Sequence, residues 1–96
     1  MTVDTNQSEL ALFIAKVEKK LDGVVEHGTD QELFISSYLQ GHFAVMAGQS
    51  QVQGMIQISQ LDELMKSSLS QAFSNNELAV DDQKQVLDLW DSYIKQ

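Results

Sequence analysis

Hydrophobic and polar residues alternate with a helical period along most of the chain. Between about residues 8 and 27 the apolar positions recur one, three or four residues apart, with lysines and acids between them. That spacing predicts an amphipathic helix, because it places the apolar side chains on one face. The face consists of Leu10, Phe13, Ile14, Val17, Leu21 and Val24.

The stretch "EHGTDQE", residues 26–32, predicts a tight turn into a second helix. Gly28 is suited to the left-handed backbone conformation that often closes a helix. Thr29 and Glu32 have the spacing of a capping box, in which each side chain accepts a hydrogen bond from the other residue's backbone amide. We therefore expect a helix from about Asp30 to Ala47. Its wide apolar face contains Phe34, Ile35, Tyr38, Leu39, His42, Phe43, Val45 and Met46.

Two further helices are predicted, from about Val52 to Phe73 and from about Val80 to Ile94, with the loop "SNNEL" between them. Four amphipathic helices joined by short turns bury their apolar faces against each other. An antiparallel four-helix bundle is the simplest such arrangement. We therefore predict one all-α domain over residues 1–96, in which residues 1–7 are flexible.

The stretch "GHFAVMAGQSQVQG", residues 41–54, raises a choice between a phosphate-binding loop and a turn. Its glycines are seven and six residues apart, and no lysine follows them. Phosphate-binding loops need closer glycines between a strand and a helix, so the pattern indicates a turn. We expect Gly48 to end the second helix and Gly54 to lie at the start of the third. Gly41 lies inside the second helix, where the close approach of another helix backbone would explain it.

The charge of the chain narrows the classes of partner. Fourteen acidic residues oppose six lysines, no arginine is present, and the net charge is −8. Nucleic acids and anionic membranes would be repelled, so we predict that the protein binds neither. The absence of cysteine excludes disulfides, thiolate metal sites and a cysteine nucleophile. No signal peptide and no apolar run near the ~20 residues of a membrane span is visible, so a cytoplasmic location is expected.

The chain contains few side chains in a catalytic or metal-binding pattern. His42 is the most interesting of them, because it lies on a mostly apolar helix face. Neither His42 nor His27 has a glutamate three residues before it, as di-iron helical bundles require. The aspartates of residues 81–91 are explained by a solvated helix face. We therefore predict no catalytic residue, no cofactor and no metal ion, and no enzymatic activity.

Two stretches together resemble the YfcL family, a group of small proteins of gammaproteobacteria. "DQELFISSYLQGHFAV", residues 30–45, is similar to the signature region of that family, and "ELAVDDQKQVLDLWDSY", residues 77–93, is similar to its C-terminal helix. The resemblance extends from Val24 onward, and "YLQGHF" is its most specific part. One departure is "AVDD", residues 79–82, which stands where the family pattern has a serine–proline start; it affects only the helix cap.

The resemblance implies a small, helical, cytoplasmic bacterial protein. The family has no assigned activity, so the resemblance transfers no catalytic residue to this chain. The residues that it marks for testing first are Tyr38, Gly41, His42 and Phe43.

Two functional hypotheses follow. The first is a non-enzymatic interaction module that binds a protein partner or a second copy of itself through the second and third helices. No Asp, Glu, Lys or Arg occurs from Leu33 to Leu61, and interface centres are depleted in charge. The alternative is a ligand-binding or catalytic bundle in which Tyr38 and His42, one helical turn apart, line a pocket. The candidate residues are Tyr38, Gln40, Gly41, His42 and Phe43.

Overall fold

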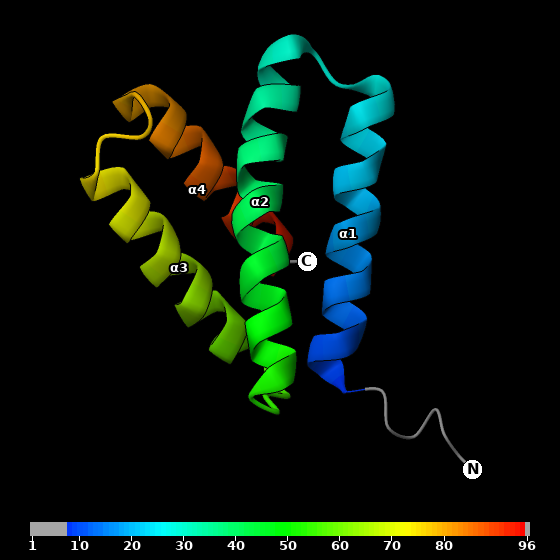
Figure 1. Cartoon of the computed structure of the whole chain (residues 1–96). Helices are drawn as coiled ribbons and strands as arrows, with labels where there is room; N and C mark the ends of the chain where they lie inside the picture. The colour runs from blue at the N-terminus through cyan, green and yellow to red at the C-terminus, as the bar shows by residue number, and fades with distance from the viewer. Residues whose placement is uncertain (1–7, 96) are drawn as a thin grey trace.

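The structure is a computed structural model that describes residues 8–95. These residues form four α-helices and no β-strand. The helices are α1 (Glu9–His27), α2 (Asp30–Val52), α3 (Ile58–Ser74) and α4 (Val80–Ile94). Successive helices run in opposite directions in Figure 1. The predicted all-α arrangement of four helices is confirmed, while the flexibility predicted for residues 1–7 concerns residues outside the described range.

The central helix of the molecule is α2. It packs against α1, α3 and α4, whereas α1 and α4 make few contacts with each other. In Figure 1, α1 and α2 stand side by side as one hairpin, and α3 and α4 form a second hairpin that crosses the first obliquely. The two hairpins are joined near the start of α1, where the backbone amide of Leu10 donates to the carbonyl oxygen of Ile56 at 3.3 Å. The end of α1 and the start of α4 lie apart (Figure 1).

Trp90 of α4 lies at the centre of the hydrophobic core. Its side chain is fully buried, and its ring centroid lies 5.9 Å from those of Phe13 on α1 and Phe43 on α2. Its indole N–H donates to Oδ1 of Asp62 on α3 at 2.8 Å, so the buried polar atom is satisfied. One side chain therefore connects all four helices. The other buried apolar residues are Leu10, Phe13, Ile14, Val17, Leu21, Ile35, Leu39, Phe43, Ala47, Leu61, Met65, Leu69, Ala72, Val86 and Tyr93.

The predicted capping box at the start of α2 is confirmed. The amide of Glu32 donates to Oγ1 of Thr29 at 3.1 Å, and the amide of Thr29 donates to Oε1 of Glu32 at 2.8 Å. The left-handed conformation predicted for Gly28 is wrong, because its φ of −82° and ψ of 160° are extended. Glycine is needed here for a steric reason. A Cβ atom on Gly28 would lie 2.7 Å from Cγ1 and 2.8 Å from the carbonyl oxygen of Val24.

The prediction that Gly48 ends the second helix is wrong, since α2 continues to Val52. Ala47 and Ser50, in the last turns of α2, are buried, and the Ser50 hydroxyl donates to the carbonyl oxygen of Ala47 at 2.7 Å. A helical glycine costs roughly 1 kcal/mol relative to alanine. Tertiary packing of these last turns offsets that cost, because most helical stability in proteins comes from packing.

The turn between α2 and α3 covers residues 53–57, so α3 begins at Ile58 rather than at the predicted Val52. Gly54 lies in this turn and not at the start of a helix. Its φ of 73° is in the left-handed region that favours glycine. The carboxamide oxygen of Gln60 accepts from the amides of Ile56 at 3.1 Å and Gln57 at 3.0 Å, which satisfies free amides at the start of α3.

Candidate functional site

Tyr38 and His42 lie next to each other on α2, on the side that faces α3. Their ring centroids are 4.9 Å apart, and the Tyr38 ring also stacks on Phe73 of α3, with centroids 6.4 Å apart. The phenol O–H of Tyr38 donates to Oε1 of Glu77 at 2.9 Å, and Nδ1 of His42 shares a hydrogen bond of 2.8 Å with the Ser68 hydroxyl. Both polar tips are therefore tied to α3 or to the loop that follows it.

This environment changes the acidity of Tyr38. Partial burial, followed by the hydrogen bond to Glu77 and the negative charge of that residue, raises the pKa of Tyr38 from 10.0 to about 12. All three causes disfavour the phenolate. The neutral phenol is therefore the form that the folded protein holds.

We expect the raised pKa of Tyr38 to lower the free energy of unfolding of the protein as the pH rises from 10 to 12. In this range the tyrosine of the unfolded chain releases its proton first, so the free energy of unfolding falls with pH. Burial also raises the pKa of Tyr93, so part of the fall has another source. Urea unfolding of the wild type and of Tyr38→Phe should show a shallower fall in the variant. Parallel pH profiles would contradict the assignment.

The other three predicted site residues do not share this environment. Phe43 is 2% exposed and belongs to the core beside Trp90, while Gln40 and Gly41 lie on the outer surface of α2. The structure thus brings Tyr38 and His42 together, and it places Phe43 in the core and Gln40 and Gly41 on the outer surface.

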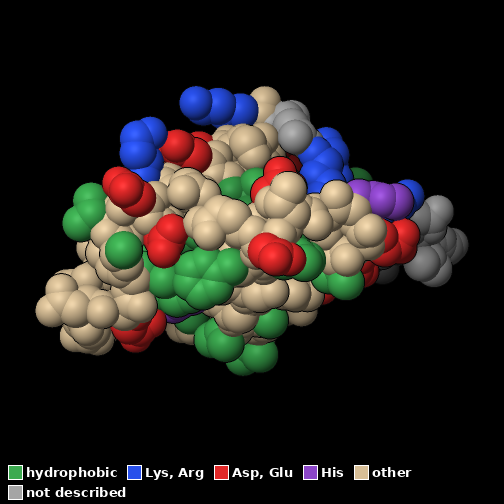
Figure 2. All heavy atoms as spheres, turned by 90° about the horizontal axis from the view of Figure 1, so that it is seen from above, with side chains coloured by type: hydrophobic (Ala, Val, Ile, Leu, Met, Phe, Trp, Pro, Cys, Tyr) green, Lys and Arg blue, Asp and Glu red, His purple; other side chains and the backbone are tan. Residues whose placement is uncertain are grey.

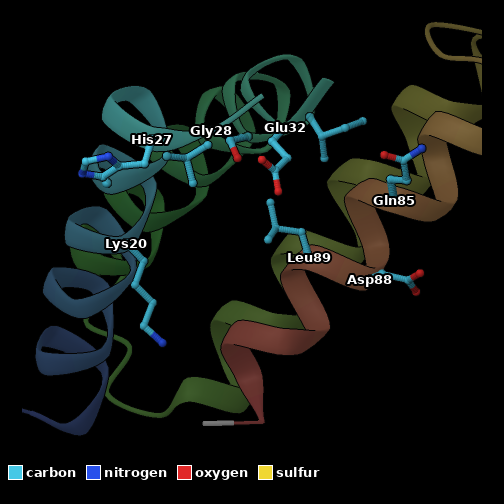
Figure 3. A pocket seen from close by; sticks show the side chains of 11 residues that line it. Lys20, His27, Gly28, Glu32, Gln85, Asp88 and Leu89 are labelled. Atoms are coloured by element: carbon cyan, nitrogen blue, oxygen red, sulfur yellow. The ribbon is translucent and has the colours of Figure 1, made fainter. Parts of the chain in front are cut away.

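A hollow of about 620 Å³ lies between α1, α2 and α4 (Figure 3). Its volume is within the roughly 300–1,000 Å³ of small-molecule sites. None of the five predicted residues lines it. In the sequence, the hollow is indicated only by Gly23, a glycine inside α1. No heavy atom lies within 4 Å of a Cβ atom placed on this residue. The lining residues are Lys20, Gly23, Val24, His27, Gly28, Glu32, Ile35, Ser36, Gln85, Asp88 and Leu89.

The side of α2 that faces away from the core carries no charged side chain beyond its first turn. We call this surface the uncharged face of α2. Along the lower middle edge of Figure 2, the side nearest the viewer in Figure 1, hydrophobic and other uncharged side chains predominate. Lysines gather instead at the upper edge (Figure 2). The exposed residues of the uncharged face are Phe34, Ser37, Gln40, Gly41, Ala44, Val45, Gly48, Gln49, Gln51 and Val52.

The helix backbone predicted to approach Gly41 is absent from the described residues 8–95. No heavy atom lies within 4 Å of a Cβ atom placed on Gly41 or on Gly48. Both glycines are exposed on the uncharged face of α2. Packing within the described part of the chain therefore does not account for either of them.

Comparison with known proteins identifies the family. The sequence pattern described as YfcL protein matches residues 11–95. The chain belongs to the YfcL family. A relative in Escherichia coli (strain K12), described as uncharacterized protein YfcL, is 30% identical over 87 residues, which cover 91% of this chain and 95% of the relative. No solved structure matches the chain.

The predicted resemblance to the YfcL family is thus confirmed. No helix between residues 8 and 95 of this YfcL family member is long and apolar enough to cross a membrane. Within the same range, no three His, Asp or Glu side chains gather closely enough to hold a metal ion. The uncharged face of α2, the Tyr38–His42 pair and the hollow are therefore the features that bear on function.

Proposed function

We propose that this chain is a non-enzymatic interaction protein of the bacterial cytoplasm. It binds a protein partner, or a second copy of itself, through the uncharged face of α2. The observation that carries the proposal is that α2, beyond its first turn, is uncharged on the side turned to solvent as well as on the side turned to the core. A helix that serves only its own bundle normally keeps charged and polar residues on its outer side.

Exposed apolar side chains support the same surface. Phe34 is 46% exposed, Val45 is 61% exposed and Val52 is 88% exposed, and all three lie on the uncharged face. They recur along α2 among glutamines and small residues instead of among charges. Interface centres are depleted in charged residues and enriched in aromatic ones, so this composition fits a surface that another protein covers.

The two open glycines are a further support. A glycine inside a helix costs up to about 1 kcal/mol relative to alanine, and neither Gly41 nor Gly48 is required by contacts within residues 8–95. Glycine is the residue that permits another backbone to come close. A partner helix lying along α2 would give both glycines a function.

The test places a negative charge in the middle of this face. Val45→Glu is expected to lower self-association, or retention of a partner from the native extract, by at least about tenfold, because a buried unpaired charge is costly. Light scattering after gel filtration measures the first, and a tagged pull-down with mass spectrometry measures the second. Gln40→Glu, on the same face, is expected to weaken association in the same direction.

Val25→Glu on α1 is the matched control. It makes the same change at a residue of similar exposure, 64% against 61% for Val45, and is expected to leave association unchanged. The proposal fails if the Val25 and Val45 variants behave alike. It also fails if the wild-type chain neither self-associates nor retains a protein.

The alternative function, a pocket beside Tyr38 and His42, has weaker support. The two rings are adjacent, but the Tyr38 hydroxyl and Nδ1 of His42 are engaged with Glu77 and Ser68. A ligand that binds either of these two atoms would have to replace its hydrogen bond. The hollow described above is lined by other residues.

A further inference from the structure

We infer that the hollow between α1, α2 and α4 binds an ω-amino acid, a zwitterion whose ammonium and carboxylate are separated by an aliphatic chain. Its ammonium would lie between Glu32 and Ser36, and its carboxylate would lie at Lys20. Its chain would lie against Val24 and Leu89, which also line the hollow. The hollow is a different surface from the uncharged face of α2, so this inference goes beyond the proposed function and does not depend on it.

The hydroxyl of Ser36 indicates that the hollow is a ligand site. Ser36 lines the hollow and is only 6% exposed. It takes part in none of the side-chain hydrogen bonds found within residues 8–95, whereas three other helical serines donate to a carbonyl three residues earlier. The large majority of buried polar side-chain atoms in proteins have a hydrogen-bond partner. A polar ligand atom in the hollow would be the partner of Ser36.

The carboxylate of Glu32 makes this end of the hollow suitable for an ammonium group. Glu32 precedes Ser36 by four residues on α2, so the two side chains lie on the same side of the helix. Figure 3 shows Glu32 projecting from α2 into the hollow. Its Oε1 accepts from the neutral amide of Thr29 at 2.8 Å, which leaves the negative charge of Glu32 without a cation. An ammonium has three N–H donors, so it can donate to Oε2 of Glu32 and to the Ser36 hydroxyl together.

Lys20 supplies a positive charge from α1. Its ammonium forms no ion pair within residues 8–95 and lies 5.8 Å from the centroid of the Tyr93 ring on α4. Figure 3 shows its side chain extending toward the gap between α1 and α4. A carboxylate in this gap would form a charge-assisted hydrogen bond with the ammonium of Lys20.

The lining therefore presents one unmatched charge of each sign. The other carboxylate of the lining, that of Asp88, is paired with Lys84 at 3.1 Å, and Figure 3 shows Asp88 and His27 pointing away from the hollow. Glu32 and Lys20 come from different helices and form no ion pair with each other. A ligand with a single charge would leave one of these two residues unmatched, whereas a zwitterion with separated charges matches both.

Apolar side chains form much of the remaining wall. Ile35 is buried at the base of the hollow, Val24 lines it from α1, and Figure 3 shows Leu89 reaching into it from α4. Small-molecule sites combine mainly apolar walls with a few polar groups that fix the orientation of the ligand. An aliphatic chain between the ammonium and the carboxylate would cover this apolar surface.

Titrations of the full chain, followed by backbone amide shifts, test the requirement for two charges. The probes are ω-aminobutanoate, ω-aminohexanoate and ω-aminooctanoate, each compared with the plain acid and the plain amine of the same chain length. At least one of the three is expected to bind at least about tenfold more tightly than its acid and its amine. The inference is overturned if none of them does so.

Norleucine tests the separation of the charges. It is an isomer of ω-aminohexanoate in which the ammonium and the carboxylate are attached to the same carbon atom. It cannot reach Glu32 and Lys20 together if these residues lie apart, so it is expected to bind at least about tenfold more weakly than the tightest ω-amino acid. Equal affinity of norleucine and that compound overturns the inference.

Glu32→Gln and Lys20→Met assign the two charges. Glutamine also serves in a capping box, so Glu32→Gln should keep the start of α2 intact while it removes the negative charge. Each variant is expected to bind the tightest ω-amino acid at least about tenfold more weakly than the wild type. Glu63→Gln and Lys19→Met make the same changes at exposed residues outside the lining and should bind it like the wild type. If the variants of the lining and their controls behave alike, the assignment is wrong.

Gly23→Leu tests the location of the site. The leucine side chain would occupy the hollow, and the variant should fold because no heavy atom lies within 4 Å of a Cβ at this position and leucine favours helix. Binding of the ω-amino acid should be lost. Gly48→Leu, an equally open helical glycine on α2, should bind it like the wild type. Retained binding in Gly23→Leu overturns the location.

Amide shifts of the wild type locate the site even if Gly23→Leu is found by circular dichroism to be unfolded. The tightest ω-amino acid should shift the amides of Val24 and Ser36 and leave that of Gly48 in place. The opposite result overturns the inference.

Ser36→Ala tests the buried hydroxyl. Because this hydroxyl has no partner within residues 8–95, the variant should unfold at no lower urea concentration than the wild type in the absence of ligand. It should bind the tightest ω-amino acid at least about threefold more weakly, because one acceptor of the ammonium is lost. Unchanged binding, or a loss of stability without ligand, would contradict the role of Ser36.

Discussion

Trp90→Ala is expected to lower the free energy of unfolding by about 3–5 kcal/mol, the usual effect of removing a buried aromatic side chain. The wild-type ring is fully buried and touches Phe13 and Phe43, and its N–H is bonded to Asp62, so the cavity would open between all four helices. Domains of this size are stable by only about 5–15 kcal/mol. Urea unfolding followed by far-ultraviolet circular dichroism measures the difference.

Trp90→Phe distinguishes the contribution of the buried aromatic ring to stability from that of its hydrogen bond. It keeps much of the apolar volume but removes the donor to Asp62, so a smaller loss of about 1–3 kcal/mol is expected. The order of stability should therefore be wild type, Trp90→Phe, Trp90→Ala. If Trp90→Ala unfolds at the same urea concentration as the wild type, α4 does not pack against the other helices as described.

Phe43→Ala is expected to cost about 3–5 kcal/mol, whereas Phe34→Ala, on the same helix, is expected to cost less than about 1 kcal/mol. Phe43 is 2% exposed and lies against Trp90, while Phe34 is 46% exposed on the uncharged face of α2. The pair compares one side chain in two environments, and urea unfolding of both variants measures it. Equal losses would contradict the orientation of α2.

The comparison of Phe43→Ala with Phe34→Ala also shows which of the two residues reports on the proposed interface. A loss of partner binding in Phe43→Ala would follow from the loss of the fold, because Phe43 belongs to the core. A loss in Phe34→Ala with unchanged stability would be an effect on the interface itself. Phe34 is therefore the more informative aromatic residue for the proposed function, although the sequence pattern placed Phe43 among the residues to test first.

The sequence predicts the helices well where charges mark their outer faces. The bounds of α4 match the prediction, and the capping box of Thr29 and Glu32 is present. Each of these features depends on residues close together in the chain. Local chemistry is sufficient to define them.

The sequence does not predict where α2 ends, because no charged residues distinguish an outer face in that region. Apolar and uncharged polar residues occupy both sides of α2, so the pattern gives no sign of which glycine terminates the helix. Burial of Ala47 and Ser50 decides the matter, and burial depends on residues far away in the sequence. Gly28 is a similar case, since its requirement for glycine comes from contact with Val24 and not from its own backbone angles.

In the candidate site, too, the features that depend on nearby residues were predicted and those that depend on distant residues were not. Helical spacing places Tyr38 next to His42, but nothing local indicates that Glu77 and Ser68 are their hydrogen-bond partners. The hollow lies beyond sequence reasoning for the same reason, because α1, α2 and α4 each contribute part of its wall.

The way the two hairpins are joined affects the hollow. They meet near the start of α1, where Leu10 is bonded to Ile56, and again at the start of α2, where the carboxamide of Gln31 donates to Asp82 of α4 at 2.9 Å. The α2 and α4 walls of the hollow are therefore fixed to each other, whereas α1 and α4 make few contacts. A change in the width of the hollow would require movement of α1 against the other two helices, and it would leave the wall between α2 and α4 intact.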